Sequence, residues 1–186
     1  MTFFLWKRLW IRALQMVLVL AGSALGLRFH QSNAAEAGGL EFALSVLGET
    51  DGADGSRHAV DLGAHPDRSA DRYQLAVTPL VPAQVTIEES GPSGERRLYP
   101  PAGESGVLAG GRTYPLPGPG AFWGRQGEVR VKVTVVPVRD RSAVAEATPF
   151  GARGVDSLAL SDGRPQVVAS QLYRSDHGGQ VELQLH

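Results

Sequence analysis

A polar segment of the chain contains two histidines and two aspartates at a spacing that could bind a metal ion. They form the pattern His58-x2-Asp61-x3-His65-x-Asp67. Imidazole nitrogens and carboxylate oxygens are ordinary Zn²⁺ ligands, and three of them with a water molecule make a catalytic zinc site. The spacing matches no standard zinc motif, however, and outside its structural context such a pattern often misleads. Solvated loop side chains are therefore the favoured interpretation, and a metal-dependent hydrolase is the alternative.

Four aromatic residues form the second candidate site, which would bind a partner: Tyr99, Tyr114, Phe122 and Trp123. Phe122 and Trp123 follow a loop rich in proline and glycine, and Trp123 is the only tryptophan after residue 37. Exposed aromatic side chains on a stiff loop are typical of interaction surfaces. Large aromatic side chains also gain free energy by burial, which favours a hydrophobic plug at one end of the fold.

No serine in the chain has the surroundings of a hydrolase nucleophile. The segments 91–94 and 103–106 place Ser93 and Ser105 beside glycines, but neither is a G-x-S-x-G elbow. Asp176 and His177 are neighbours in a turn, where they do not orient each other as a catalytic triad requires. The sequence therefore predicts no catalytic residue and no cofactor.

Length and composition set the fold class. The chain has 186 residues, a net charge of −1, no cysteine, 23 glycines and 12 prolines. This length favours one domain, and the missing cysteines exclude disulfides and thiolate metal sites. The glycine and proline content favours strands and turns over long helices. Without a basic patch, nucleic acid is not an expected partner.

The first 37 residues differ from the rest of the chain. Lys7, Arg8 and Arg12 precede an uncharged stretch over 13–27, and a run of small residues follows at 32–37. A basic start, an apolar run and a small-residue cleavage site are the parts of a secretory signal. Cleavage fits after Ala34 or after Ala37, and the second position is favoured.

Two other interpretations of residues 1–37 stay open, a retained membrane anchor and a buried helix. The uncharged stretch of 15 residues is short for a spanning helix, which needs about 20 apolar residues. If the segment is retained, the basic residues before it keep the N-terminus cytoplasmic and direct the rest outward. We therefore expect an exported protein, periplasmic or secreted, or anchored to the inner membrane by one N-terminal hydrophobic helix.

The remainder, residues 38–186, alternates apolar and polar residues over many short segments. This period-2 pattern indicates half-buried strands. The predicted strands are 40–47, 59–62, 73–80, 83–89, 95–99, 112–116, 128–138, 157–160, 166–173 and 180–185. The segment 128–138 is the strongest, because four valines line one face and Arg130, Lys132 and Thr134 line the other, wet face.

Two longer features complete the prediction for this domain. Residues 48–72 form a polar loop, apart from the short strand at 59–62, and residues 166–185 form a C-terminal hairpin. One helical turn is expected over 142–147. Short strands with turns between them favour a single antiparallel β-sandwich over 38–186, either immunoglobulin-like or a partly open barrel.

The order of features from about residue 72 to 137 resembles an uncharacterised bacterial domain family that often lies beside caspase-like peptidases or protein kinases. The segments that carry the resemblance are 73–78, Gly94, Leu98-Tyr99-Pro100, 108–117 and 128–136. Pro101 and Pro115 depart from the family pattern, and no peptidase or kinase is attached. The resemblance implies a β-sandwich accessory module and assigns no catalytic residue.

These observations together favour an exported, non-enzymatic module of the cell envelope that acts by binding or assembly. The expected partner is another envelope protein. Membrane contact is expected only through residues 1–37, if they are retained. A membrane-tethered subunit of a larger complex and the metal-dependent hydrolase are the alternatives.

Overall fold

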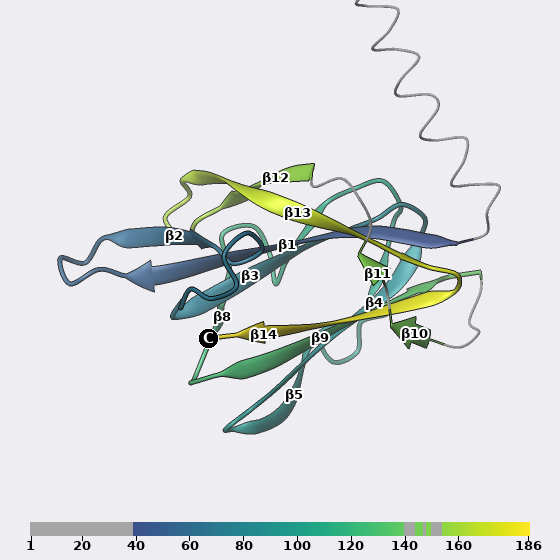
Figure 1. Cartoon of the computed structure of the whole chain (residues 1–186), viewed down its shortest axis with the longest axis horizontal. Coiled ribbons are helices and arrows are strands. Elements are labelled where there is room, and N and C mark those ends of the chain that lie inside the picture. Colours follow the sequence, from purple (N-terminus) through teal and green to yellow (C-terminus); the bar gives the residue numbers. More distant parts are fainter. Residues whose placement is uncertain (1–38, 140–143, 147, 150–153) are drawn as a thin grey trace, which may run out of the picture. The chain divides into compact units, whose positions relative to one another are not determined.

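The computed structural model describes residues 39–139, 144–146, 148, 149 and 154–186, and this part of the chain is built from strands and turns without a helix (Figure 1). It confirms a mainly β protein with antiparallel sheets. The N-terminal hydrophobic helix expected within residues 1–37 lies outside the described residues. The described part contains no helix with the length and apolar character needed to cross a bilayer.

The described residues contain fourteen strands, which form two sheets. The first sheet has the order β11-β13-β1-β3-β7, with β12 paired to β13, β2 to β1 and β8 to β3. Its strands are β1 (Leu40–Asp51), β2 (Arg57–Asp61), β3 (Arg72–Pro79), β7 (Tyr114–Leu116), β8 (Trp123–Gly124), β11 (Thr148–Pro149), β12 (Gly154–Ala159) and β13 (Pro165–Ser175).

The second sheet has the order β10-β14-β9-β4-β5, with β6 paired to β4. Its strands are β4 (Ala83–Gly91), β5 (Gly94–Tyr99), β6 (Val107–Leu108), β9 (Val129–Pro137), β10 (Val144–Glu146) and β14 (Gly178–Leu185). All pairs in both sheets are antiparallel except β10 with β14, which is parallel. The strand β10 replaces the helical turn predicted over 142–147, as far as those residues are described.

The main core lies between the two sheets and follows from the alternation in the sequence. Inward-facing side chains of β1, β3, β4 and β9 alternate with outward-facing ones, as a pleated strand requires. The buried cluster includes Phe42, Leu44, Val46, Tyr73, Leu75 and Val77 from the first sheet, and Val85, Ile87, Val131, Val133 and Val135 from the second. The valine face predicted for 128–138 is therefore confirmed as a core face.

The first sheet curls, so that its outer face is covered as well. A second buried cluster on that face joins Leu47, Ala76, Leu158, Leu160 and Val168, with Phe122 packed against it. Ser45 of β1 donates a hydrogen bond to Asp156 of β12 at 2.5 Å, although β13 lies between these strands in the sheet. Strand β1 is consequently buried on both faces, where the sequence predicted a half-buried strand.

The predicted C-terminal hairpin is wrong in its pairing. Both strands exist, but β13 pairs with β1 in the first sheet and β14 pairs with β9 in the second. The turn between them is tight, and the buried Ser175 hydroxyl donates to the carbonyl of Gly178 at 2.8 Å. This turn moves the chain from one sheet to the other, a choice that depends on distant strands and leaves no local signal.

The predicted polar loop over 48–72 is also wrong in part. Strand β1 continues to Asp51, and β2 pairs with it from Arg57 to Asp61, so the segment starts with a hairpin. Only residues 62–71 form the connection to β3. The polar composition misled the prediction, because some of these polar side chains are buried against each other.

Candidate functional site

The structure does not bring together the four residues of the candidate metal site, His58, Asp61, His65 and Asp67. The Asp61 carboxylate accepts the N–H groups of Ala64 at 2.9 Å and Ala169 at 2.7 Å, which ties β2 to β13. His65 and Asp67 lie exposed in the connection after β2. Within the described residues, no three His, Asp or Glu side chains are grouped closely enough to hold a metal ion.

The β1–β2 turn places a serine between a histidine and an aspartate, a constellation the sequence analysis did not anticipate. Ser56 Oγ lies 2.5 Å from Asp54 Oδ1 and 2.8 Å from His58 Nε2. The hydroxyl has one proton and a carboxylate only accepts, so the proton points to Asp54 and His58 Nε2 must donate. An activated nucleophile needs the reverse, with the histidine accepting the hydroxyl proton. The contacts therefore stabilise the turn, and the hydrogen bonds from Ser56 lower the pKa of Asp54.

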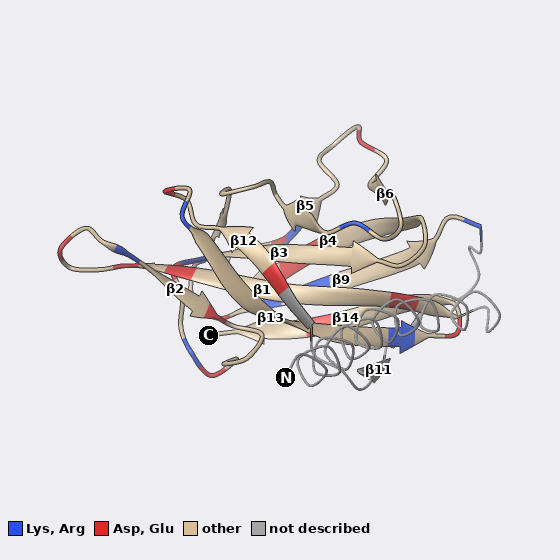
Figure 2. Ribbon diagram, turned by 90° about the horizontal axis from the view of Figure 1, so that it is seen from above, with Lys and Arg blue, Asp and Glu red and all other residues tan. Residues whose placement is uncertain are grey.

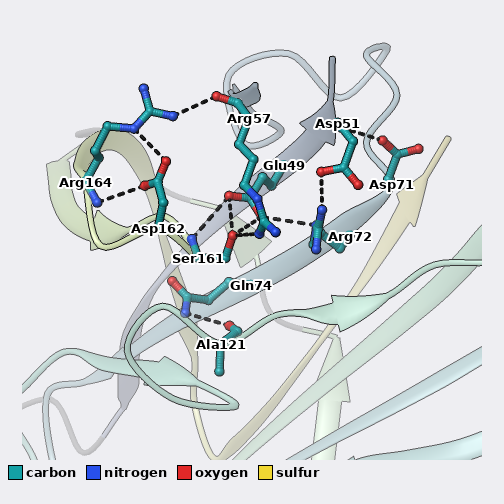
Figure 3. A network of polar contacts seen from close by, with 10 residues as sticks. All are labelled: Glu49, Asp51, Arg57, Asp71, Arg72, Gln74, Ala121, Ser161, Asp162 and Arg164. Atoms are coloured by element: carbon teal, nitrogen blue, oxygen red, sulfur yellow. Dashed lines mark hydrogen bonds and ion pairs between the residues drawn. The ribbon is translucent and has the colours of Figure 1, made fainter. Parts of the chain in front are cut away.

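A buried carboxylate lies at the centre of a polar network of the first sheet (Figure 3). Glu49 of β1 is fully buried, and its Oε2 lies 3.1 Å from Arg72 Nε and 3.4 Å from Arg57 Nη1. Ser161 donates both its N–H, at 3.1 Å, and its hydroxyl, at 2.7 Å, to the same carboxylate. Arg72 also pairs with the exposed Asp51. We call these residues, Glu49, Asp51, Arg57, Arg72 and Ser161, the Glu49 network.

The Glu49 network has a structural role. Ser161 lies in the turn between β12 and β13, so its two hydrogen bonds fasten this turn to β1. Arg164, from the same turn, donates to the Arg57 carbonyl at 2.8 Å and to Asp162 at 2.7 Å. Two guanidinium groups compensate the carboxylate, which is what a buried charge requires. The arrangement holds the curled part of the first sheet in place.

Gln74 fastens a second loop to the outer face of the first sheet. Its Nε2 donates to the carbonyl of Gly118 at 2.5 Å and to that of Ala121 at 2.8 Å. The loop held in this way carries Phe122 and Trp123. Gln74 therefore fixes the position of two aromatic residues that the sequence analysis proposed as a binding surface.

The four candidate aromatic residues are all half-buried and pack against the core, and they do not share one surface. Phe122 packs against the outer cluster of the first sheet, whereas Trp123 packs between the sheets, 5.7 Å from the Tyr73 ring. Tyr114 accepts the N–H of Ala109 at 3.0 Å. Burial raises the pKa of the Tyr99 hydroxyl.

A polar bridge crosses the core and reaches the surface of the second sheet. The buried Tyr73 hydroxyl donates to Glu89 of β4, whose other carboxylate oxygen lies 2.7 Å from Arg96 Nε. Arg96 then donates to the carbonyl of Gly124 at 3.0 Å, which links β5 to β8 of the opposite sheet. Burial, and secondly the contact with Glu89, raise the pKa of Tyr73 well above its ordinary range.

This bridge ends in a groove of about 850 Å³ on the outer face of the second sheet. Outward-facing side chains of β4, β9 and β14 form its floor, and β5 with the loop 100–104 forms its wall. The charged residues that line it are Glu88, Glu89, Glu95, Arg96, Arg97, Glu104, Arg130, Lys132 and Glu182. We call this hollow the charged groove.

Ion pairs across neighbouring strands organise the floor of the charged groove. Lys132 Nζ lies 2.8 Å from Glu88, Arg97 lies 3.5 Å from the same residue, and Arg130 lies 3.1 Å from Glu182. The Lys132 hydrogen bond lowers the pKa of Glu88, and the same contact raises the pKa of Lys132. Acidic and basic residues are scattered over the strands and loops of the described chain (Figure 2), and both kinds line the groove. The groove thus presents both signs of charge.

Part of this site follows from the sequence pattern. Arg130 and Lys132 were predicted to line the wet face of their strand, and they form the groove floor. The wall was missed, because nothing in the local sequence shows that the loop 100–104 lies beside β9 and β14. The comparisons with known proteins give no further guidance, since no family model, curated protein or solved structure matches the chain.

Proposed function

We propose that the chain is an exported, non-enzymatic module that docks another protein of the cell envelope in the charged groove. The proposed architecture is a β-sandwich with one curled sheet, closer to a partly open barrel than to an immunoglobulin-like domain. The family resemblance supports the same proposal, because an accessory module beside a larger enzyme acts by binding. The observation that carries the proposal is the groove itself, with its ion pairs at the surface.

The chemistry of the groove favours binding over catalysis. Among the described residues that line it, the only hydroxyl group belongs to Ser90, and no histidine is present to act as a base. The Glu88 and Glu89 carboxylates are paired with cations. A pair of catalytic carboxylates would instead need environments that separate their pKa values.

The same chemistry favours a polypeptide as the occupant. A near balance of positive and negative side chains complements a segment that also carries both signs, whereas nucleic acid needs a basic surface. The ion pairs are partly exposed, so they can exchange partners at low cost when a peptide arrives.

Site-specific crosslinking in cells tests the docking. A photoreactive residue in place of Ala102, which lines the groove, should give one discrete adduct with the full chain, identified by mass spectrometry. The double variant Arg97→Glu, Lys132→Glu should lose this adduct. The matched control Arg68→Glu, Arg174→Glu has the same charge change at exposed positions outside the groove and should keep it. An adduct that survives reversal of the groove charges, or no adduct, would refute the proposal.

Export is tested separately. Cell fractionation should find the protein outside the cytoplasm, and the intact mass of the native protein should show whether residues 1–37 are removed. A mature chain that begins near residue 38 corresponds to the cleaved signal, and a complete chain in the membrane fraction corresponds to the tethered subunit. A complete chain in the cytoplasm would contradict the proposed location.

A further inference from the structure

Most of the exposed large apolar side chains of the described structure lie at one end of the domain. Five such residues are exposed in the described structure, and four lie at this end: Leu80 at 44%, Val81 at 42%, Val107 at 48% and Val138 at 41%. The fifth, Val167, lies near the start of β13, away from them. Exposed apolar side chains that gather from separate segments usually mark an interaction surface.

Backbone contacts join these four residues into one surface, which we call the apolar end. Val138 donates its N–H to the carbonyl of Pro82 at 3.0 Å, which brings the end of β9 to the β3–β4 turn that holds Leu80 and Val81. Val107 of β6 pairs with Gln84, directly after that turn. The three segments therefore close the same end of the two sheets.

The chain enters the domain at the apolar end. Leu80 donates its N–H to the carbonyl of Glu41 at 3.0 Å, next to the first residue of β1. The C-terminus lies at the opposite end of the domain (Figure 1). Twelve residues, 28–39, connect the uncharged stretch 13–27 to β1, and twelve residues span at most about 43 Å when fully extended. A chain held in a bilayer by that stretch keeps the apolar end within reach of the lipid surface.

We infer that the apolar end is a docking surface for a phospholipid bilayer, in addition to any contact made by residues 1–37. Its aliphatic side chains can enter the region between headgroups and acyl chains, as on peripheral membrane proteins. Arg112 and Arg139 are exposed beside them and can reach lipid phosphates, and Asp176 in the neighbouring turn offsets one of these charges. Apolar contact is therefore the main source of binding, and electrostatic attraction is the smaller one.

The size of the apolar end favours a bilayer over a second copy of the chain. Four aliphatic side chains exposed by less than half offer roughly 300 Å², whereas a stable interface buries about 800 Å² on each partner. A bilayer needs no matching surface, and a tether removes most of the entropic cost of binding it. The inference rests on the proposed export of the domain, in the form in which residues 1–37 are retained as a membrane anchor, but not on the charged groove.

The absence of cysteine makes a direct test possible, because one introduced cysteine can be labelled alone. We would reconstitute the full chain in vesicles of phosphatidylcholine and phosphatidylglycerol, with an environment-sensitive fluorophore on Val81→Cys. Its emission should shift to the blue and be quenched by lipid-borne quenchers. The matched control, Val167→Cys, is exposed elsewhere and should keep emission typical of water. Water-like emission at position 81 would overturn the inference.

A second measurement separates the bilayer from a protein partner. If a second copy covered the apolar end, the blue shift would grow with the protein-to-lipid ratio and lipid-borne quenchers would have no effect, which would also overturn the inference. In the full chain labelled at Val81→Cys, the further changes Leu80→Ser and Val138→Ser should abolish the blue shift, whereas Val167→Ser should leave it unchanged. The groove variant Arg97→Glu, Lys132→Glu should keep the blue shift. Failure of the proposed docking in the charged groove can therefore be distinguished from failure of bilayer contact at the apolar end.

Discussion

Replacing Glu49 by glutamine removes the one buried charge on which the curled part of the first sheet depends. The side chain keeps its shape, so the change isolates the carboxylate. Arg57 and Arg72 lose their shared partner, and Ser161 loses a charged acceptor for two hydrogen bonds. The glutamine amide has one oxygen acceptor where the carboxylate had two, and its NH₂ group would face the donors of Arg57, Arg72 and Ser161, which is costly at a fully buried position.

The expected cost can be compared with that of a neighbouring carboxylate on the same strand. Glu49 is fully buried, so Glu49→Gln should lower the free energy of unfolding by about 3 kcal/mol, or roughly 6–12 °C in Tm. The Asp51 side chain is 58% exposed and pairs with the same Arg72. Asp51→Asn should therefore cost less than about 1 kcal/mol, as exposed ion pairs do.

Urea unfolding of the full-length variants, followed by circular dichroism, measures both effects. The location of the damage is equally specific. Hydrogen exchange should accelerate first at residues 160–164, because Ser161 fastens that turn to β1, while β4 and β9 should keep their protection. Equal costs for the two variants, or loss of protection throughout the domain without a local change in this turn, would refute the assignment.

Three further predictions concern other parts of the fold. Tyr73→Phe should cost about 2 kcal/mol, because a buried carboxylate loses a hydrogen bond. Folding raises the Tyr73 pKa above its ordinary value of 10.0, so the unfolded chain loses that proton first and wild-type stability falls above about pH 10. Urea unfolding at several alkaline pH values should show a smaller decline of the free energy of unfolding in Tyr73→Phe than in the wild type. The same decline in both proteins would mean that other groups cause the loss of stability. Gly48→Ala should lower the free energy of unfolding by about 1–3 kcal/mol, because the new Cβ would lie 2.6 Å from another side chain. Gly124→Ala has open space around its Cβ and should be nearly neutral. Thermal unfolding measures both variants, and equal effects would contradict this packing. Lys132→Met should raise the Glu88 pKa towards its ordinary value. NMR titration of the Glu88 carboxyl carbon measures this change. The same Glu88 pKa in the variant and the wild type would mean that the ion pair does not form in solution.

The strands of the main core could be predicted from the sequence, and the reason is local. In β4 and β9, successive side chains alternate between the core and solvent, so the apolar pattern indicates both the strand and its buried face. The β4–β5 hairpin was predictable for the same reason, since one short turn connects its strands. A period-2 pattern therefore predicts a strand and its buried face where the other face is exposed to solvent.

The pattern fails where a strand is buried on both faces or where polar residues are interior. Strand β1 seemed to end at residue 47 because Glu49 and Asp51 follow, yet Glu49 is buried by partners from residues 57, 72 and 161. The pairing of β13 with β1, in place of β14, likewise depends on residues more than a hundred positions away. The partners of these polar side chains come together only in the folded chain. From composition alone, the segments that carry them are therefore predicted as loops.

Burial separates the structural charges of this fold from those available for binding. Glu49 and Glu89 are held in the interior by arginines and connect strands that are distant in sequence, so changing them should unfold part of the domain. Lys132 and Arg97 pair at the surface, where their contacts cost little to exchange. Substitution of Glu49 or Glu89 is therefore expected to abolish binding because the domain loses stability. Substitution of Lys132 or Arg97 is expected to change binding while the domain stays folded. This difference allows the charged groove to be tested with variants that keep the fold.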